Sequence, residues 1–253
     1  MTDFSADIDL LFGELPFADR CRAAKNSGFS AVEFTMPDNV PLGELGDAAA
    51  YEGLKTSVIQ MPEDKAALAF SKPMKKDFLA AFEDLADKAD FLECRKILIP
   101  GKILAENEFD DARDAFVSAL HAAAGKAKRY GIKILIGFKN GVENPGFYPA
   151  STLEVLEILD ELNDDKAFGY LYDVYHAQCT EGGLSNTLES LSSLISHVRI
   201  AGVPMHEEPD TGEVNYDYLL SLLDAAGYDG YVGCSYTPRL KTADGLKWMK
   251  KYL

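Results

Sequence analysis

The sequence predicts an α/β protein of the (β/α)8 TIM barrel class, folded as a single domain over residues 1–253. Short runs rich in β-branched and aromatic residues alternate with longer amphipathic runs along the whole chain. No serine- and glycine-rich linker or low-complexity tract interrupts this alternation. The length of 253 residues is normal for one such barrel.

Eight runs have the composition and length of strands buried in a parallel sheet. They cover residues 4–12, 29–35, 54–60, 96–102, 133–139, 168–176, 197–202 and 229–237. A doubly wound open sheet is the alternative architecture. However, the first strand-to-helix turn, LLFGELPF, lacks the glycine fingerprint of a dinucleotide-binding fold. The pattern therefore favours the barrel.

The runs between the strands carry apolar residues three and four positions apart, as helices packed on a sheet require. Examples are PFADRCRAAKNSG, KKDFLAAFEDLADKADFLEC, DARDAFVSALHAAAGKAKRYG and NYDYLLSLLDAAGY. Ser151 and Asn215 are predicted to cap the N-termini of two helices. Four glycines stand just before strands, where helix C-terminal glycines belong. They are Gly28, Gly53, Gly131 and Gly227.

Charge and cysteine content exclude several classes of function. The chain has 41 acidic and 25 basic residues and a formal net charge of −16. Because nucleic acids and anionic membranes require a basic surface, neither is expected as a partner. The four cysteines show no zinc-ligand or CxxC spacing, and no signal peptide or membrane-length apolar run is found. We expect a soluble cytoplasmic protein; a homo-oligomer is compatible with the sequence.

In a barrel of this class the active site lies at the C-terminal ends of the strands. The candidate residues there are Glu33, Thr35, Gln60, Lys102, Gly137, Lys139, Asp173, His176, Arg199, Ser235 and Tyr236, with His206 and Glu207 in the polar loop after the seventh strand. Asp173 ends a strand that is aromatic and aliphatic, FGYLYD. A carboxylate in such surroundings needs a partner, because an unpaired buried charge is costly.

Several stretches of the chain resemble the hydroxypyruvate isomerase group of the xylose isomerase-like barrels, a superfamily of sugar isomerases, epimerases and endonuclease IV-type enzymes. The resemblance is carried by LLFGELPFADRCRAAKNSGFSAVEF, YDVYHAQ, SHVRIAGVP and EPDTGEVNYDYLLSLLDAAGYDGYVGCSYTPRLKTADGLKWM. It covers nearly the whole chain. It implies a barrel fold and a small hydroxy-carbonyl or sugar-acid ligand.

Enzymes of that superfamily typically hold one divalent cation with a glutamate, an aspartate, a histidine or glutamine, and a second glutamate, one from each of strands five to eight. The two glutamates also act as acid and base. The matching positions here are Gly137, Asp173, Arg199 and Ser235. Glycine offers no ligand, arginine would repel a cation, and an unactivated serine is a poor base. We therefore expect no metal and no cofactor, and an Asp173–Arg199 ion pair instead.

The loop after the seventh strand departs from the family as well. The family usually reads Arg-His-Glu-Pro there, with the arginine and histidine facing the substrate, whereas this chain reads His206-Glu207-Glu208-Pro209. His206 and Glu207 could form a base with its orienting carboxylate, or belong to a solvated loop. His176 could be a general acid or a hydrogen-bonded strand-end residue. Lys139 could bind an anion or lie on the surface.

Two classes of function remain open. The first is a metal-free isomerase, with Arg199 and Lys139 stabilising an enediolate and Asp173, His176 or His206 moving the proton. Its substrate contacts would be Lys139, Glu33, Gln60, Glu207 and Tyr236, although Glu33 could instead neutralise a lysine. The second is a non-catalytic homologue that serves as a ligand-binding, regulatory or structural subunit. Burial of Phe138, Tyr175 and Tyr236 across the mouth of the barrel would favour the second class. His197 is expected to be an ordinary strand-start residue.

Overall fold

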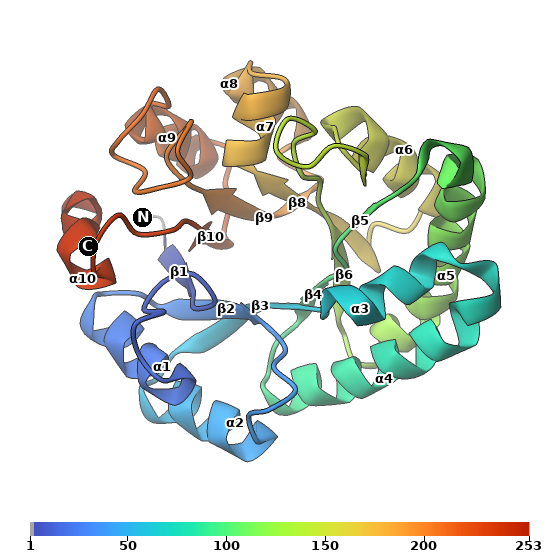
Figure 1. Ribbon diagram of the computed structural model, residues 1–253. Helices are drawn as coiled ribbons and strands as arrows, with labels where there is room; N and C mark the ends of the chain where they lie inside the picture. Colours follow the sequence, from blue (N-terminus) through green and yellow to red (C-terminus); the bar gives the residue numbers. More distant parts are fainter. Residues whose placement is uncertain (1–2, 253) are drawn as a thin grey trace. The chain divides into compact units, whose positions relative to one another are not determined.

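A computed structural model of the protein describes residues 3–252. The barrel strands are β1 (Asp3–Asp7), β2 (Ala31–Thr35), β3 (Lys55–Gln60), β4 (Lys96–Leu98), β6 (Lys133–Ile136), β8 (Phe168–Asp173), β9 (Ile195–Ile200) and β10 (Tyr231–Cys234). They pair in the order β1–β10–β9–β8–β6–β4–β3–β2 and close into a barrel (Figure 1). The predicted (β/α)8 barrel is therefore confirmed, and the open-sheet alternative is excluded.

Helices follow the strands as the apolar periodicity predicts. They are α1 (Phe17–Asn26), α2 (Leu42–Tyr51), α3 (Glu63–Ala66), α4 (Lys75–Phe91), α5 (Phe109–Arg129), α6 (Thr152–Leu162), α7 (Val174–Thr180), α8 (Leu184–Leu191), α9 (Tyr216–Ala225) and α10 (Thr242–Gly245), with 3-10 turns at Ala67–Phe70, Lys72–Met74, Glu106–Glu108 and Leu246–Lys251. Both predicted caps are confirmed: Ser151 accepts from the Glu154 amide, and Asn215 accepts from the Tyr218 amide. The four predicted helix-end glycines all have positive φ.

Every predicted strand overlaps a barrel strand, but most end earlier than the composition suggests. The clearest case is the predicted strand 168–176, where β8 stops at Asp173 and α7 begins at Val174. His176 consequently lies in a helix and not at a strand end. The short antiparallel pair β5 (Lys102–Ile103) and β7 (Phe147–Tyr148) was not predicted.

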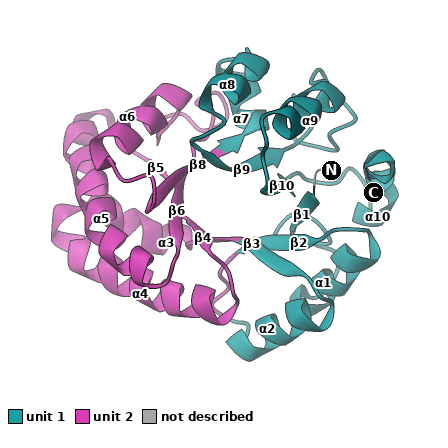
Figure 2. Ribbon diagram, turned by 180° about the vertical axis from the view of Figure 1, so that it is seen from behind, with its two compact units in different colours: residues 1–34, 39–57, 172–253 teal, residues 35–38, 58–171 magenta. Residues whose placement is uncertain are grey.

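The described chain divides into two compact units, coloured separately in Figure 2. Unit 2 comprises residues 35–38 and 58–171 and has an apolar interior. Its strands contribute a buried cluster of Val58, Leu98, Leu135 and Leu171. Outside that cluster, the rings of Phe70 and Phe116 stack with centroids 4.2 Å apart.

Unit 1 comprises residues 1–34, 39–57 and 172–253, so it combines the N-terminal and C-terminal parts of the described chain. The ring of Trp248 packs edge-on against Phe4 at 5.5 Å, which fixes the C-terminal turn to β1. In contrast to unit 2, the strands of unit 1 bury many polar side chains. These polar side chains form the candidate site.

No helix within residues 3–252 combines the length and the apolar character that crossing a membrane requires.

Candidate active site

Polar residues of unit 1 gather on one face of its strands. They are Ser5 and Asp7 on β1, Glu33 on β2, Ser57 on β3, His197 and Arg199 on β9, and Ser235 just after β10. Side chains two positions apart lie on the same face of a strand, which is why Ser5 and Asp7 of β1, and His197 and Arg199 of β9, point the same way. The register places Asp7 beside Glu33, and Arg199 beside Gly233. We call this set the polar cluster.

Glu33 is the centre of the polar cluster and is fully buried. Its Oε1 accepts a hydrogen bond from Arg199 Nε at 2.6 Å, and its Oε2 lies 2.7 Å from His197 Nε2. Burial alone would raise the pKa of Glu33, but Arg199 and His197 outweigh it and hold the pKa at about 2. Glu33 is thus an internal counter-ion. The alternatives of a lysine partner for Glu33 and an ordinary strand position for His197 are both wrong.

Gly233 on β10 makes room for the carboxylate of Glu33. A Cβ atom at this position would lie 2.5 Å from Glu33 Oε2, closer than non-bonded atoms approach. Any other residue would displace the carboxylate from Arg199 and His197. Gly233 is therefore part of the polar cluster although it has no side chain.

Arg199 is held through its Nε by Glu33, and its side chain is 12% exposed. Burial would lower its pKa, but Glu33, Asp7 and Asp173 together raise the pKa above the ordinary value. Asp173 thus contributes to the field at Arg199, but the direct partner is Glu33. The predicted Asp173–Arg199 ion pair is wrong. Within the described chain, the terminal Nη groups of Arg199 have no hydrogen-bond partner.

Asp173 has a local partner in the backbone of the residues that follow it. Its Oδ1 accepts from the amides of Tyr175 at 3.0 Å and His176 at 3.3 Å, so it caps the N-terminus of α7. A buried carboxylate is satisfied there by backbone donors and by the helix dipole. The partner that the Asp173 carboxylate requires is therefore the first turn of α7, which it caps.

Asp7 is the last residue of β1 and is buried. Its Oδ2 accepts from Ser235 Oγ at 2.8 Å, and its Oδ1 accepts from the Asp9 amide at 3.1 Å. Burial raises the pKa of Asp7 to about 7, against the opposing effects of Arg199 and Ser235; Glu33 and Asp9 add to the rise. Two neighbouring carboxyl groups, Asp7 and Glu33, therefore differ strongly in their affinity for a proton.

The loop after β9 brings His206 to α7. The His206 ring lies 4.2 Å from the Tyr175 ring and 6.2 Å from the His176 ring, measured between centroids. The structure thus brings together the two predicted histidines. Glu207 pairs with Arg239 at 3.5 Å rather than with His206, so a base with its orienting carboxylate is not formed there. The neighbouring Glu208 is buried and also bonds Arg239.

The remaining predicted residues are not members of the polar cluster. In unit 2, Lys139 binds Glu63 at 3.3 Å and lies over the Phe147 ring, while Gln60 ends β3 and is partly exposed. Gly137 follows β6, and a Cβ there would be 3.0 Å from the Leu171 carbonyl oxygen. In unit 1, Tyr236 is buried and accepts a hydrogen bond from Trp248 Nε1.

No three His, Cys, Asp or Glu side chains in residues 3–252 are grouped so that they could hold a metal ion. All four cysteines are free thiols.

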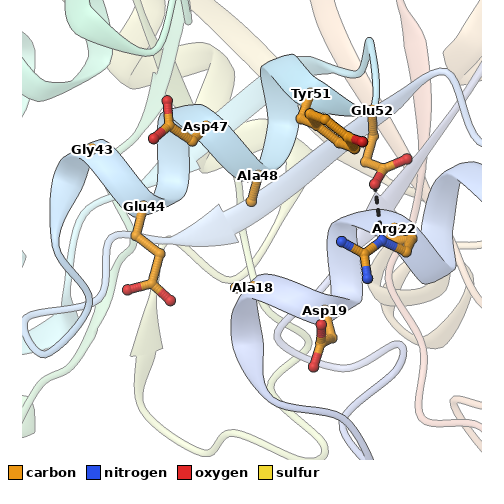
Figure 3. Close-up of a pocket in the computed structure, with 9 residues that line it drawn as sticks. All are labelled: Ala18, Asp19, Arg22, Gly43, Glu44, Asp47, Ala48, Tyr51 and Glu52. Carbon is orange, nitrogen blue, oxygen red and sulfur yellow. Dashed lines mark hydrogen bonds and ion pairs between the residues drawn. The ribbon is translucent and has the colours of Figure 1, made fainter.

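A surface hollow of about 630 Å³ lies on the outer helices of unit 1, between α1 and α2 (Figure 3). Its charged lining consists of Asp19, Glu44, Asp47 and Glu52 with one cation, Arg22. Arg22 is already paired with Glu52 at 3.1 Å. Because the lining is acidic, this hollow does not suit an anionic ligand.

Comparison with known proteins gives the family. A sequence model of the xylose isomerase-like TIM barrel family matches residues 21–252. The chain belongs to the xylose isomerase-like TIM barrel family. A 2-oxo-tetronate isomerase of Haemophilus influenzae is 35% identical over the full length of both chains. The hydroxypyruvate isomerase of Escherichia coli K12 is 33% identical, again over the full length of both.

Solved structures agree with the fold. The crystal structure titled AP endonuclease, family 2, from Brucella melitensis has a TM-score of 0.95 and 32% identity, covering 100% of this chain and 99% of that one. A 3-keto-D-glucoside 4-epimerase from E. coli has a TM-score of 0.83 at 18% identity, covering 99% of both chains. This second likeness concerns the fold alone.

Sequence reasoning missed five members of the polar cluster: Ser5, Asp7, Ser57, His197 and Gly233. A signal for Asp7 was available, because it stands two residues after Ser5 in a strand whose alternate residues are apolar. Two polar side chains on one face of a buried strand indicate a polar interior. No comparable local signal exists for Gly233, whose role depends on Glu33.

Proposed function

We propose that the protein is an isomerase of small hydroxy-carbonyl acids and that it works without a divalent metal. Full-length relatives named hydroxypyruvate isomerase and 2-oxo-tetronate isomerase support the reaction class. The observation that carries the metal-free part is Arg199, fixed through Nε by the buried Glu33 with its Nη groups left for another anion. A guanidinium has five donors, of which this contact uses one.

The residues at the positions of the family's metal ligands do not fit a divalent cation. Gly137 has no side chain to coordinate a metal, and a Cβ atom there would lie only 3.0 Å from the Leu171 carbonyl oxygen. Arg199 is a permanent cation. Ser235 donates its hydroxyl to Asp7, and Asp173 caps α7. A hard cation requires several oxygen or imidazole ligands, so one capped aspartate would not hold it.

Arg199 can supply the electrostatic part of an isomerisation. Moving a proton between adjacent carbons passes through an enediolate, whose negative oxygen must be stabilised. A largely buried guanidinium that is already oriented does this with little reorganisation. It can equally hold the carboxylate of the substrate. His176 and His206, which lie in unit 1 with Arg199, remain proposed contacts, whereas Lys139 and Gln60 stay predictions from the sequence.

A non-catalytic ligand-binding, regulatory or structural subunit is the second candidate. It is favoured by the burial of Phe138, Tyr175 and Tyr236, the aromatic residues that follow β6, β8 and β10. A cytoplasmic location, the absence of a cofactor and the oligomeric state stay predictions from the sequence.

The deciding experiment is α-proton exchange in heavy water, followed by NMR, with hydroxypyruvate and 2-oxo-tetronate as substrates. We expect exchange that persists in excess chelator. Arg199→Gln should slow it by about 100-fold or more, as loss of an oxyanion donor does. Arg22→Gln is the matched control, because it removes the same charge from an exposed Nε–carboxylate pair.

The outcomes separate the two candidates. Exchange that requires added Mg²⁺ or Mn²⁺ would contradict the metal-free mechanism. No exchange on either substrate, with or without metal, would favour the non-catalytic homologue.

A further inference from the structure

We propose that Asp7, at the C-terminal end of β1, is the catalytic carboxyl group that carries the substrate's proton, and that Ser235 positions it. This inference rests on the isomerase function proposed above. It assigns acid–base chemistry to a carboxyl group on β1, held by a serine that follows the adjacent strand β10.

The other buried carboxyl groups of the described chain already have different roles. Four acidic side chains are buried in residues 3–252: Asp7, Glu33, Asp173 and Glu208. Glu33 is the counter-ion of Arg199, and Asp173 caps α7. Glu208 bonds Arg239, and its Oε1 is so close to Gly245 that a Cβ there would clash. Asp7 alone of these four has neither a cationic contact partner nor a helix to cap.

The position of Asp7 suits proton transfer. It ends its strand, on the side of the barrel where active sites of this fold form. One hydrogen bond to each oxygen, from Ser235 Oγ and the Asp9 amide, fixes the plane of the carboxyl group. Each oxygen keeps a second lone pair that can accept a proton.

The surroundings of Asp7 and Glu33 divide the acid–base roles between them. The charged and polar groups around Asp7 are Arg199 from β9, Glu33 from β2, Asp9, and Ser235 after β10. With its pKa raised to about 7, Asp7 is populated both as acid and as base near neutrality, whereas Glu33 stays ionised. Paired carboxyl groups with such separated pKa values are typical of acid–base sites.

The reaction balances without any oxidant or reductant. The Asp7 carboxylate accepts the proton of the hydroxyl-bearing carbon, and the C–H electron pair becomes the C=C bond of the enediolate. The carbonyl π pair moves to its oxygen, beside the Arg199 guanidinium. Asp7 then returns the proton to the former carbonyl carbon, and the hydroxyl proton passes between the two oxygens. Exchange of the Asp7 proton with heavy water before its return places deuterium in the product.

The test is the pH dependence of α-proton exchange in three variants. Asp7→Asn should slow exchange by about 100-fold to 10,000-fold, the usual contribution of a general base. Ser235→Ala should keep activity but move the acidic limb of the profile about one pH unit higher, because the carboxylate loses a hydrogen bond. Asp3→Asn is the matched control, since Asp3 is an exposed aspartate at the opposite end of β1. It should leave the rate and the profile unchanged.

One further readout and one criterion for Ser235 keep the result decisive. Carbon-13 NMR of the aspartate side chains should show one carboxyl group that titrates near pH 7 and is missing in Asp7→Asn. A purely structural Ser235 would lower the rate at every pH without moving the limb. Wild-type exchange with an unchanged Asp7→Asn profile overturns this inference alone. Absence of exchange in the wild type overturns the proposed function, and this inference with it.

Discussion

At the scale of single residues, the Glu33–Arg199 contact decides both the stability and the chemistry of the polar cluster. Glu33→Gln keeps the shape of the side chain but leaves Arg199 in the interior without its counter-ion. Breaking one half of a buried pair typically costs about 3–5 kcal/mol. We expect a loss of that order in the free energy of unfolding, measured by urea titration.

A matched control exists on the surface of unit 1. Arg22 and Glu52 form the same Nε–Oε1 contact, at 3.1 Å, but the Arg22 side chain is 62% exposed. Because exposed ion pairs contribute little to stability, Glu52→Gln should change the free energy of unfolding only slightly. Equal, small losses in both variants would show that Glu33 carries no net charge in the folded protein.

The sequence identified several residues of the site but not their partners. Glu33 and Arg199 were both predicted as site residues because strand ends form the active face of a barrel. Their contact joins residues 166 positions apart, and no local pattern encodes a pairing at that distance. The Asp173–Arg199 prediction failed for the same reason. It assumed that the nearer strand would supply the counter-charge, whereas α7 supplied backbone donors to Asp173.

At the scale of elements, Asp173 marks the junction of β8 and α7. Asp173→Ala removes the cap of α7 and should destabilise the protein by about 1 kcal/mol, whereas Asp173→Asn can still accept from the same amides. Urea unfolding of the two variants should therefore differ. Ser151→Ala, which removes the cap of α6, is the control for an ordinary capping loss. An equally large loss in Asp173→Asn and Asp173→Ala would mean that the charge of Asp173, and not the cap, is what matters.

The elements themselves were predictable because their signals are local. Helix periodicity, two capping residues and four helix-end glycines fixed the alternation that makes a barrel. Strand ends were less predictable. Tyr175 and His176 continue the aromatic composition of β8, so composition alone does not indicate that the strand ends. They lie in α7, whose N-cap is Asp173. The pair β5–β7 was missed because two-residue strands carry no periodicity.

At the scale of the whole molecule, the buried Asp7 should make folding stability depend on pH. In the unfolded chain an aspartate has a pKa near 3.8, whereas in the folded protein Asp7 has a pKa of about 7. Between these values the folded state binds one more proton than the unfolded state. Stability from this group is therefore fully present below pH 3.8 and is lost as the pH rises through 7.

Glu33 makes folding stability depend on pH in the opposite direction and over a lower pH range. Its folded pKa of about 2 lies below the ordinary value of 4.5, so its contribution is present above pH 4.5 and is lost as the pH falls toward 2. Between pH 5 and 7, Asp7 therefore contributes a slope of up to about 1.4 kcal/mol per pH unit and Glu33 contributes almost none.

Comparison of the wild type with Asp7→Asn isolates that slope, because every other titrating group is shared. Urea unfolding at pH 5.5 and pH 8 should show that the wild type loses more stability than the variant as the pH rises. Asparagine cannot ionise, so the free energy of unfolding of the variant should rise relative to that of the wild type between pH 5.5 and pH 8. The same pH dependence in both proteins would mean that Asp7 is ionised throughout this range. In that case Arg199 would dominate its surroundings, and the acidic limb of the α-proton exchange profile would lie below this pH range.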